Sequence, residues 1–278
     1  MIKTETNAEY HSNPAVSKSR LAKIGVCPKY YKWCLDNPQP KTDELIFGSA
    51  FHKWVLEKDD FENEFTVIPK LNKRTNAGKA EYDRLVAEAE AANKEIVSEE
   101  SFDIIKEMEA ALMENPATAK LLKGNHENSI YFTDEFTGID CKCRPDSFRT
   151  LGDRIVCVDL KTTSDSSPVA CQKAIVKYGY DLQAYMYSLG LSKEFNVPME
   201  NIDFIFLFVE KKAPYLSYFV QADNYVLQRG ENIFREYLGI LKYCNETDNW
   251  YGYNGASAQI APISLPSYLI KELKGDIE

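Results

Sequence analysis

The sequence contains the stretches CRPD at residues 143–146 and DLKTT at residues 159–163. A glycine–aspartate pair at residues 152–153 favours a two-residue hairpin turn between them, because both residues tolerate the backbone angles that this turn needs. Counted outwards from the turn, the hairpin places Asp146 opposite Asp159. Directly opposed residues in a sheet have Cβ atoms roughly 4.5–5.5 Å apart. Two carboxylates at that distance repel each other, so the pattern predicts a positive charge between them.

Side-chain alternation along the second strand extends this prediction. Residues two apart share a face of a strand, so Asp159 and Lys161 point to one side while Val158 and Leu160 point to an apolar core. Asp146, Asp159 and Lys161 are therefore expected at one edge of a sheet. Carboxylates that hold a divalent cation and a lysine beside a water molecule are what metal-dependent phosphodiester hydrolysis requires. Taken alone the pattern is common, and a surface hairpin with a neutralising lysine is then the simpler explanation.

Other stretches in the chain accompany this pattern in a fixed order. They are SKSRL at 17–21, GSAFH at 48–52, NKRT at 72–75, YDLQ at 180–183 and QAYMY at 183–187. Together with CRPD and DLKTT they resemble the PD-(D/E)XK nuclease superfamily. The resemblance is strongest to the exonuclease VIII-like (RecE-type) double-strand DNA exonucleases of phages and prophages, and it extends from about residue 17 to about residue 243.

The resemblance implies an α/β (α+β) fold with a restriction-endonuclease-like core. A mixed central sheet flanked by helices would carry an N-terminal helical extension. We expect a flexible arm over 1–15 and a single nuclease domain over 16–246, with a helical part over 16–123 and the catalytic sheet core over 124–246. A C-terminal tail with one short helix would follow over 247–278.

The resemblance also implies the composition of a metal site. The expected ligands of Mg²⁺, with Mn²⁺ as the other candidate, are Asp146, Asp159, the backbone carbonyl of Leu160, and His52. Lys161 would orient the attacking water and stabilise negative charge on the phosphate. Glu127 would reach a second metal ion or its water, although an exposed glutamate at the start of a strand is an equally simple interpretation.

Two helices supply further candidate residues. Gln183 and Tyr187 lie four residues apart and share a helix face with Tyr180. Polar tips on that face indicate a site, where they would bind the scissile phosphate or order Lys161. On the earlier helix, a glycine at position 48 would let the helix approach the sheet and bring His52 near the metal.

Basic residues outside this site are candidates for DNA binding. Lys70, Lys73 and Arg74 form a loop that would clamp phosphates, with Arg74 at the DNA end, although a solvated run of charge is the alternative. Lys32 lies among aromatic residues that suit contact with the DNA backbone. Tyr180 is a further candidate for DNA binding.

Length, composition and charge narrow the range of possible functions. The 278 residues include 44% hydrophobic residues, enough for a large core, and have a formal net charge of −9. That charge argues against a general nucleic-acid binder but not against a nuclease whose basic surface is local. No long apolar run and no secretion signal are present, so a cytoplasmic protein without membrane contact is expected. The seven cysteines are scattered, which predicts reduced core thiols and no iron–sulfur cluster.

The function that the resemblance implies is a Mg²⁺-dependent exodeoxyribonuclease. It would act on the ends of linear double-stranded DNA, digest from 5′ to 3′, and leave 3′ single strands for a single-strand annealing recombination protein. A homo-oligomeric ring, a trimer or tetramer, is implied as well. The alternatives are a RecB-like single-strand or structure-specific DNA nuclease, and a non-catalytic nuclease-like scaffold that binds DNA or a partner.

Overall fold

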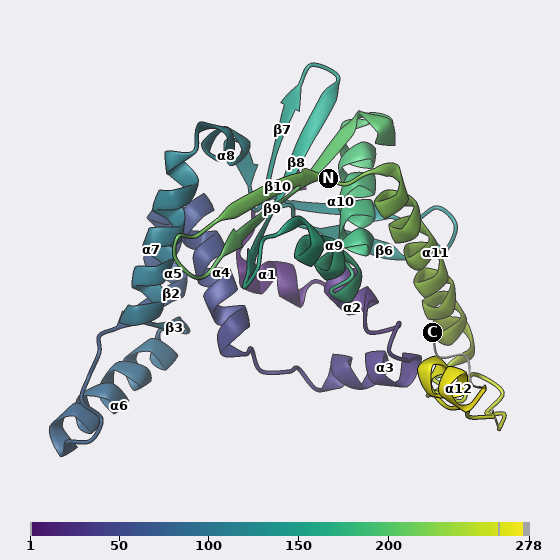
Figure 1. Cartoon of the computed structure of the whole chain (residues 1–278), viewed down its shortest axis with the longest axis horizontal. Helices are drawn as coiled ribbons and strands as arrows, with labels where there is room; N and C mark the ends of the chain where they lie inside the picture. The colour runs from purple at the N-terminus through teal and green to yellow at the C-terminus, as the bar shows by residue number, and fades with distance from the viewer. Residues whose placement is uncertain (1, 261, 275–278) are drawn as a thin grey trace.

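A five-stranded mixed sheet lies at the centre of the computed structural model, which describes residues 2–260 and 262–274 (Figure 1). Its strand order is β10-β9-β8-β7-β4. The strands are β4 (Asn125–His126), β7 (Ser147–Leu151), β8 (Arg154–Thr163), β9 (Ile202–Glu210) and β10 (Ser217–Gln221). Strands β8 and β9 are parallel, and the other pairs are antiparallel. The sheet is therefore mixed, as the sequence predicted.

The β7–β8 hairpin has the predicted register, with Leu151 opposite Arg154 and Ser147 opposite Val158. The ladder ends at Ser147 and Val158, however, so it does not include the predicted pair of Asp146 and Asp159. Strand β6 (Asp140–Cys143) belongs to a separate three-stranded sheet with β5 (Ser129–Thr133) and β1 (Ile2–Lys3). Pro145 has no N–H for a sheet hydrogen bond, so the ladder is interrupted where the chain passes from one sheet to the other. Asp146 lies at the end of this crossing, immediately before β7.

Helices cover both faces of the central sheet and enclose two apolar clusters (Figure 1). On one face Phe204, Phe206 and Phe208 of β9 pack against α10 (Tyr180–Phe195) and α11 (Asn224–Thr247). On the other face Val158 and Leu160 of β8 pack with α4 (Asp43–Leu56) and α7 (Glu99–Glu114). The alternation predicted for β8 is confirmed. Asp159 and Lys161 consequently face the α10 side.

The remaining elements extend this core. They are α2 (Lys18–Leu21), α3 (Pro28–Asp36), η1 (Lys58–Asp60), α5 (Phe61–Glu64), β2 (Phe65–Ile68), α6 (Asn76–Ala91), β3 (Glu95–Ser98), α8 (Pro116–Leu121), α9 (Pro168–Lys177), η2 (Met199–Asn201) and α12 (Ser267–Lys274). Strands β2 and β3 form a small parallel sheet, from which α6 projects away from the central sheet (Figure 1). Helix α12 is the short helix predicted near the end of the tail.

The prediction of a loose arm over residues 1–15 is wrong for the described part of that segment. Ile2 and Lys3 pair with β5, and α1 (Asn7–Ser12) follows. A capping box opens α1, since the side chain of Thr6 accepts from the N–H of Glu9 while the Glu9 carboxylate accepts from the N–H of Thr6. The buried ammonium of Lys142 donates to two backbone carbonyls at the end of this segment. The N-terminal residues are thus part of the folded body.

Within the described residues, the structure has no helix that is both long enough and apolar enough to cross a membrane.

The contact between α10 and α11 leads to a stability prediction. A Cβ added at Gly230 of α11 would lie 2.1 Å from the carbonyl oxygen of Asp181, whereas a Cβ at Gly239 of the same helix meets no atom within 4 Å. We expect Gly230→Ala to lower the free energy of unfolding by about 1–3 kcal/mol, because the helices must separate. The matched control Gly239→Ala should raise that free energy by about 0.5–1 kcal/mol. Urea denaturation measures both, and stabilisation by both substitutions would contradict the packing described.

Candidate active site

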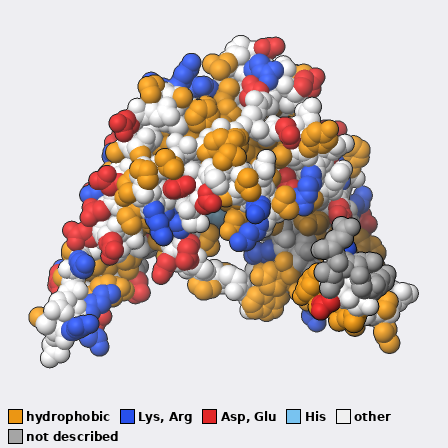
Figure 2. All heavy atoms as spheres, viewed as in Figure 1, with side chains coloured by type: hydrophobic (Ala, Val, Ile, Leu, Met, Phe, Trp, Pro, Cys, Tyr) orange, Lys and Arg blue, Asp and Glu red, His pale blue; other side chains and the backbone are white. Residues whose placement is uncertain are grey.

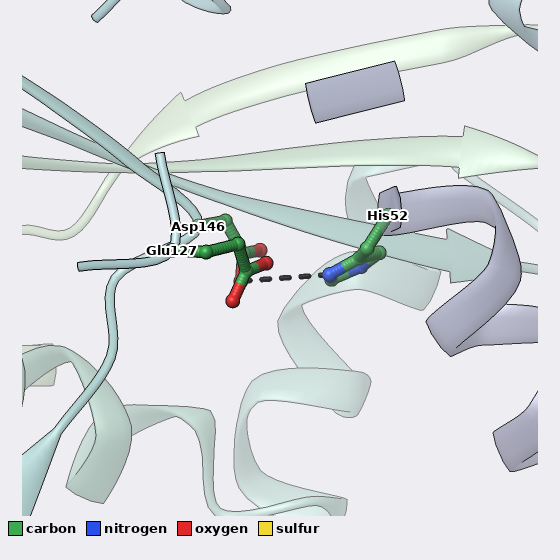
Figure 3. A group of neighbouring side chains, drawn as sticks. All are labelled: His52, Glu127 and Asp146. Carbon is green, nitrogen blue, oxygen red and sulfur yellow. Dashed lines mark ion pairs between the residues drawn. The ribbon is translucent and has the colours of Figure 1, made fainter. Parts of the chain in front are cut away.

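Three side chains from different parts of the chain point toward one another beside the central sheet (Figure 3). His52 comes from α4, Glu127 from the link between β4 and β5, and Asp146 from the crossing before β7. One ligand atom of each residue lies within 4.8 Å of the ligand atoms of the other two. The Nδ1 atom of His52 is 3.5 Å from Oδ1 of Asp146. We refer to these three residues as the carboxylate–histidine cluster.

The backbone holds the two carboxylates of this cluster in place. Glu127 has a φ of +49°, in the left-handed region that a residue with a side chain occupies at some cost. Its N–H donates to the carbonyl of Asp146 at 3.3 Å. The Asp146 carboxylate in turn accepts a hydrogen bond of 2.6 Å from the N–H of Leu160. Glu127 is half-buried, so the interpretation as an exposed glutamate is wrong.

Asp159, the second aspartate of the predicted motif, has partners of its own on the α10 side. It is fully buried, and its Oδ1 accepts from the side-chain amide of Gln183 at 2.6 Å. Its Oδ2 lies 2.6 Å from the ammonium of Lys161. The amide of Gln183 thus orders the aspartate beside Lys161. The sequence predicted that Gln183 would bind the scissile phosphate or order Lys161; in the structure it contacts Asp159, the partner of Lys161, and its role toward the phosphate stays a prediction.

The electrostatics of the cluster differ from one carboxylate to the next. Burial and the nearby charge of Asp146 raise the pKa of Glu127 to about 8. Burial also raises the pKa of Asp146, but several neighbours lower it more strongly, so the pKa lies below its ordinary value. These neighbours are His52, through its charge and a hydrogen bond, the charge of Lys161, and the N–H of Leu160. The low pKa keeps Asp146 ionised, and Glu127 is ready to lose its proton when a cation arrives.

The Asp159–Lys161 pair shows the same competition between burial and charge. Burial raises the pKa of Asp159 to about 6, against the lowering effect of Lys161, while Asp146 adds a further increase. Burial lowers the pKa of Lys161, yet Asp159 and Asp146 raise it above its ordinary value overall. Lys161 therefore stays charged at neutral pH and is suited to stabilise an anion rather than to accept a proton.

The carboxylate–histidine cluster fits a divalent cation. Two carboxylates and an imidazole converge, and a bound cation would offset both the burial and the repulsion from Asp146 that raise the pKa of Glu127. Carboxylate oxygens suit Mg²⁺ and Mn²⁺, and imidazole is also found around Mn²⁺ and related metals. Asp159 and the Leu160 carbonyl were expected as ligands as well. Asp159 is paired with Lys161 and Gln183 instead, so these two ligand assignments stay predictions.

The prediction that Gly48 lets its helix approach the sheet closely is wrong. A Cβ at Gly48 would meet no atom within 4 Å, so the absence of a side chain does not serve helix–sheet packing. Gly48 and His52 lie four residues apart and share a face of α4. The structure therefore leaves open space at Gly48, one helical turn from the imidazole of His52.

The other predicted residues lie at different distances from the cluster. Tyr187 is half-buried with its ring against Phe204, and burial raises the pKa of its hydroxyl well above the ordinary value. The basic loop of Lys70, Lys73 and Arg74 precedes α6, which projects away from the central sheet (Figure 1). The Nζ of Lys32 lies 5.2 Å from the ring centroid of Trp250. The structure does not bring these cations to the cluster, and their DNA contacts stay predictions.

Sequence reasoning did not select two cations that surround the site. Arg144 donates to the Ser129 hydroxyl and lies 4.2 Å from the ring centroid of Tyr10. Lys18 lies 5.6 Å from the ring centroid of Tyr180. Arg144 belongs to the CRPD motif and Lys18 to the SKSRL motif. The order of residues along the chain does not reveal what each side chain of a motif contacts.

Comparisons with known proteins identify the family and the fold. The model of a family described as "PDDEXK-like domain of unknown function (DUF3799)" matches residues 17–261. A crystal structure from Eubacterium rectale, named "Putative exonuclease", has 15% sequence identity, covers 99% of this chain and 100% of that chain, and has a TM-score of 0.63. A likeness at this identity concerns the fold alone. The family match and this likeness confirm the restriction-endonuclease-like α/β fold.

Two further comparisons add no argument. A crystal structure of SSO0001 has 13% identity, covers 68% of this chain and 85% of that chain, and has a TM-score of 0.27, which is too low to establish a common fold. A search of the curated proteins gave no match.

The raised pKa of Glu127 predicts how stability depends on pH in the absence of metal. Its folded pKa of about 8 exceeds the ordinary 4.5, so the free energy of unfolding falls as the pH rises between these values. Glu127→Gln removes this loss. In EDTA we expect the variant to melt at a higher temperature than the wild type near pH 8, with a much smaller difference near pH 5. A melting-temperature difference that does not change with pH would contradict the assignment.

A cation held by the carboxylate–histidine cluster should stabilise the folded protein. At about 100 times its dissociation constant, Mg²⁺ or Mn²⁺ is expected to add about 2.7 kcal/mol to the free energy of unfolding. Asp146→Asn should abolish this gain. Asp103→Asn removes an exposed carboxylate of α7 that pairs with Lys106 and does not belong to the cluster; it is the control and should retain the gain. Thermal denaturation with and without metal measures the effect, and an equal gain in both variants would place the cation elsewhere.

Proposed function

The chain belongs to the PDDEXK-like family that its residues 17–261 match, and we propose that it is a metal-dependent DNA nuclease. More specifically, it is an exodeoxyribonuclease that acts on the ends of linear double-stranded DNA. The observation that carries this proposal is that Asp146 belongs to a cluster that fits a divalent cation and is also close enough to the Lys161 ammonium for that charge to lower its pKa.

The residues of the site divide the work of phosphodiester hydrolysis. A divalent cation bound by His52, Glu127 and Asp146 supplies positive charge that polarises the phosphate and makes a water molecule more acidic. Lys161 stabilises the charge that develops on the phosphate oxygens. Asp159 and Gln183 hold Lys161 in position through the contacts described above. The open space beside Gly48 leaves room for the DNA backbone.

The direction and product of digestion follow from the resemblance to the exonuclease VIII type. We propose digestion from 5′ to 3′, which leaves 3′ single strands for a single-strand annealing recombination protein. A homo-oligomeric ring, a trimer or tetramer, would surround the duplex and keep the enzyme on it. These features rest on the motifs quoted for the resemblance, and the order of those motifs along the chain is what supports them.

The proposal is tested with end-labelled linear duplex and with closed circular duplex of the same sequence. Wild type with Mg²⁺ or Mn²⁺ should release acid-soluble nucleotides from the linear DNA only, and EDTA should stop the reaction. Asp146→Asn and Lys161→Met should each lower the rate by roughly 10²–10⁴-fold, because each removes charge that acts on the reacting phosphate. Lys106→Met on α7 removes an exposed lysine and is expected to leave the rate unchanged.

The outcomes of this experiment separate the candidate functions. Cleavage of circular duplex would show that the protein is an endonuclease and not an exonuclease. Digestion confined to single strands would favour the RecB-like alternative, whereas binding without any cleavage in either metal would favour a non-catalytic scaffold. The label that is released first, 5′ or 3′, tests the direction of digestion.

A further inference from the structure

Cations and aromatic rings alternate along the surface that leads away from Lys161. The Nζ of Lys161 lies 5.0 Å from the ring centroid of Tyr180, and the Nζ of Lys18 lies 5.6 Å from the same centroid. The Tyr180 ring is tilted against that of Tyr178 at 5.6 Å, and the Nζ of Lys177 lies 5.1 Å from the Tyr178 ring centroid. We call Lys18, Lys177, Tyr178 and Tyr180 the outer strip.

The fold brings the outer strip together from two segments that are far apart in the sequence. Lys18 is the first residue of α2, and the other members lie at the junction of α9 and α10, which is adjacent to α2 (Figure 1). Gly179 makes this junction in a left-handed conformation with a φ of +62°, which glycine adopts without strain. The turn at Gly179 packs the tyrosines on its two sides against each other.

The charges of the outer strip are not balanced by carboxylates. Lys161 is neutralised by Asp159, but among the described residues neither Lys18 nor Lys177 forms an ion pair. The ammonium of Lys18 donates to the backbone carbonyl of Tyr178 at 2.8 Å. Burial and the repulsion of Lys161 lower the pKa of Lys18 to about 8, with Asp159 opposing them. A partly buried ammonium without a counterion is stabilised when an anion binds.

The outer strip is also accessible. Lys177 is exposed, Tyr178 is 53% exposed, and Lys18 and Tyr180 are half-buried. Figure 2 shows Lys and Arg side chains among acidic ones across the visible face, so positive surface in this chain of net charge −9 occurs locally. Unpaired lysines interleaved with aromatic rings are the groups that bind a nucleic-acid strand through its phosphates without reading its sequence.

We propose that the outer strip binds the sugar–phosphate backbone of one DNA strand, continuing the path from the phosphate at Lys161 to the protein surface. The inference rests on the proposed nuclease function, because a nuclease binds a DNA strand at its site. It adds the part of the protein surface along which that strand lies. Lys18 contacts the phosphate nearest to the scissile one, and Lys177 contacts a phosphate farther out. Tyr178 and Tyr180 provide the surface between them.

Salt dependence of binding tests the proposal without any cleavage. The probe is a fluorescein-labelled oligothymidylate, and its affinity is measured by fluorescence anisotropy in EDTA over a range of salt concentrations. Each phosphate contact to a single strand contributes roughly 0.7 to the slope of log affinity against log salt concentration. Lys18→Met and Lys177→Gln should each reduce the slope by about that amount, and the double variant by about twice as much. Lys23→Met, a half-buried lysine five residues beyond Lys18, is the control and should leave the slope unchanged.

The results decide between defined alternatives. The proposal that the outer strip binds DNA is supported if the slope is reduced in either strip variant and unchanged in the control. An unchanged slope in both strip variants overturns it, and so does an equal reduction in the Lys23→Met control. Circular dichroism checks that each variant is folded, and Lys177→Gln, on an exposed position, tests the proposal if Lys18→Met does not fold.

Failure of the strip and failure of the nuclease proposal can be told apart. If wild type digests linear duplex but the strip variants keep the full slope, the strip is wrong and the nuclease proposal stands. If wild type digests no DNA but the slopes fall as expected, the strip stands as a binding surface and the nuclease proposal fails.

Discussion

The crossing between the two sheets is the constraint on which the site depends. The chain leaves β6 after Cys143 and enters β7 at Ser147, so the residues between them have no strand partner on either side. Asp146 uses this freedom to accept from the N–H of Leu160 and to face His52. Glu127 is placed by the same crossing, because its N–H donates to the carbonyl of Asp146. A continuous strand would have committed these backbone groups to a ladder.

Asp146 and Asp159 have different roles because their neighbours differ. Asp146 faces an imidazole and a second carboxylate, which form a set of donors for a cation. Asp159, on the α10 face of β8, is fully buried and is neutralised by Lys161 and Gln183. Repulsion between two carboxylates is thereby reduced in two ways, by a cation site on one side and by a lysine on the other. Lys161 is close enough to influence both carboxylates.

Local chemistry determined which parts of the fold and site could be predicted from the sequence. The turn at residues 152–153 set the hairpin register, and alternation along β8 set the faces of Asp159 and Lys161. The pairing of β1 with β5 and the partner of Gln183 depend on contacts between segments distant in sequence. No periodicity records such contacts. The resemblance named Glu127 as a candidate site residue, but its left-handed backbone, its place beside His52 and Asp146 and its raised pKa needed the structure.

The N-terminal segment has a consequence for how the protein acquires its structure. Glu5 accepts from the hydroxyl of Tyr131, 126 residues later, and β1 has its only described strand partner in β5. During synthesis on the ribosome, β1 therefore waits unpaired until the second sheet has emerged. Pairings between such distant segments slow folding, since a long loop must close before they form. The region that supports Arg144 and Lys142 is thus expected to be among the last to consolidate, after the local β7–β8 hairpin.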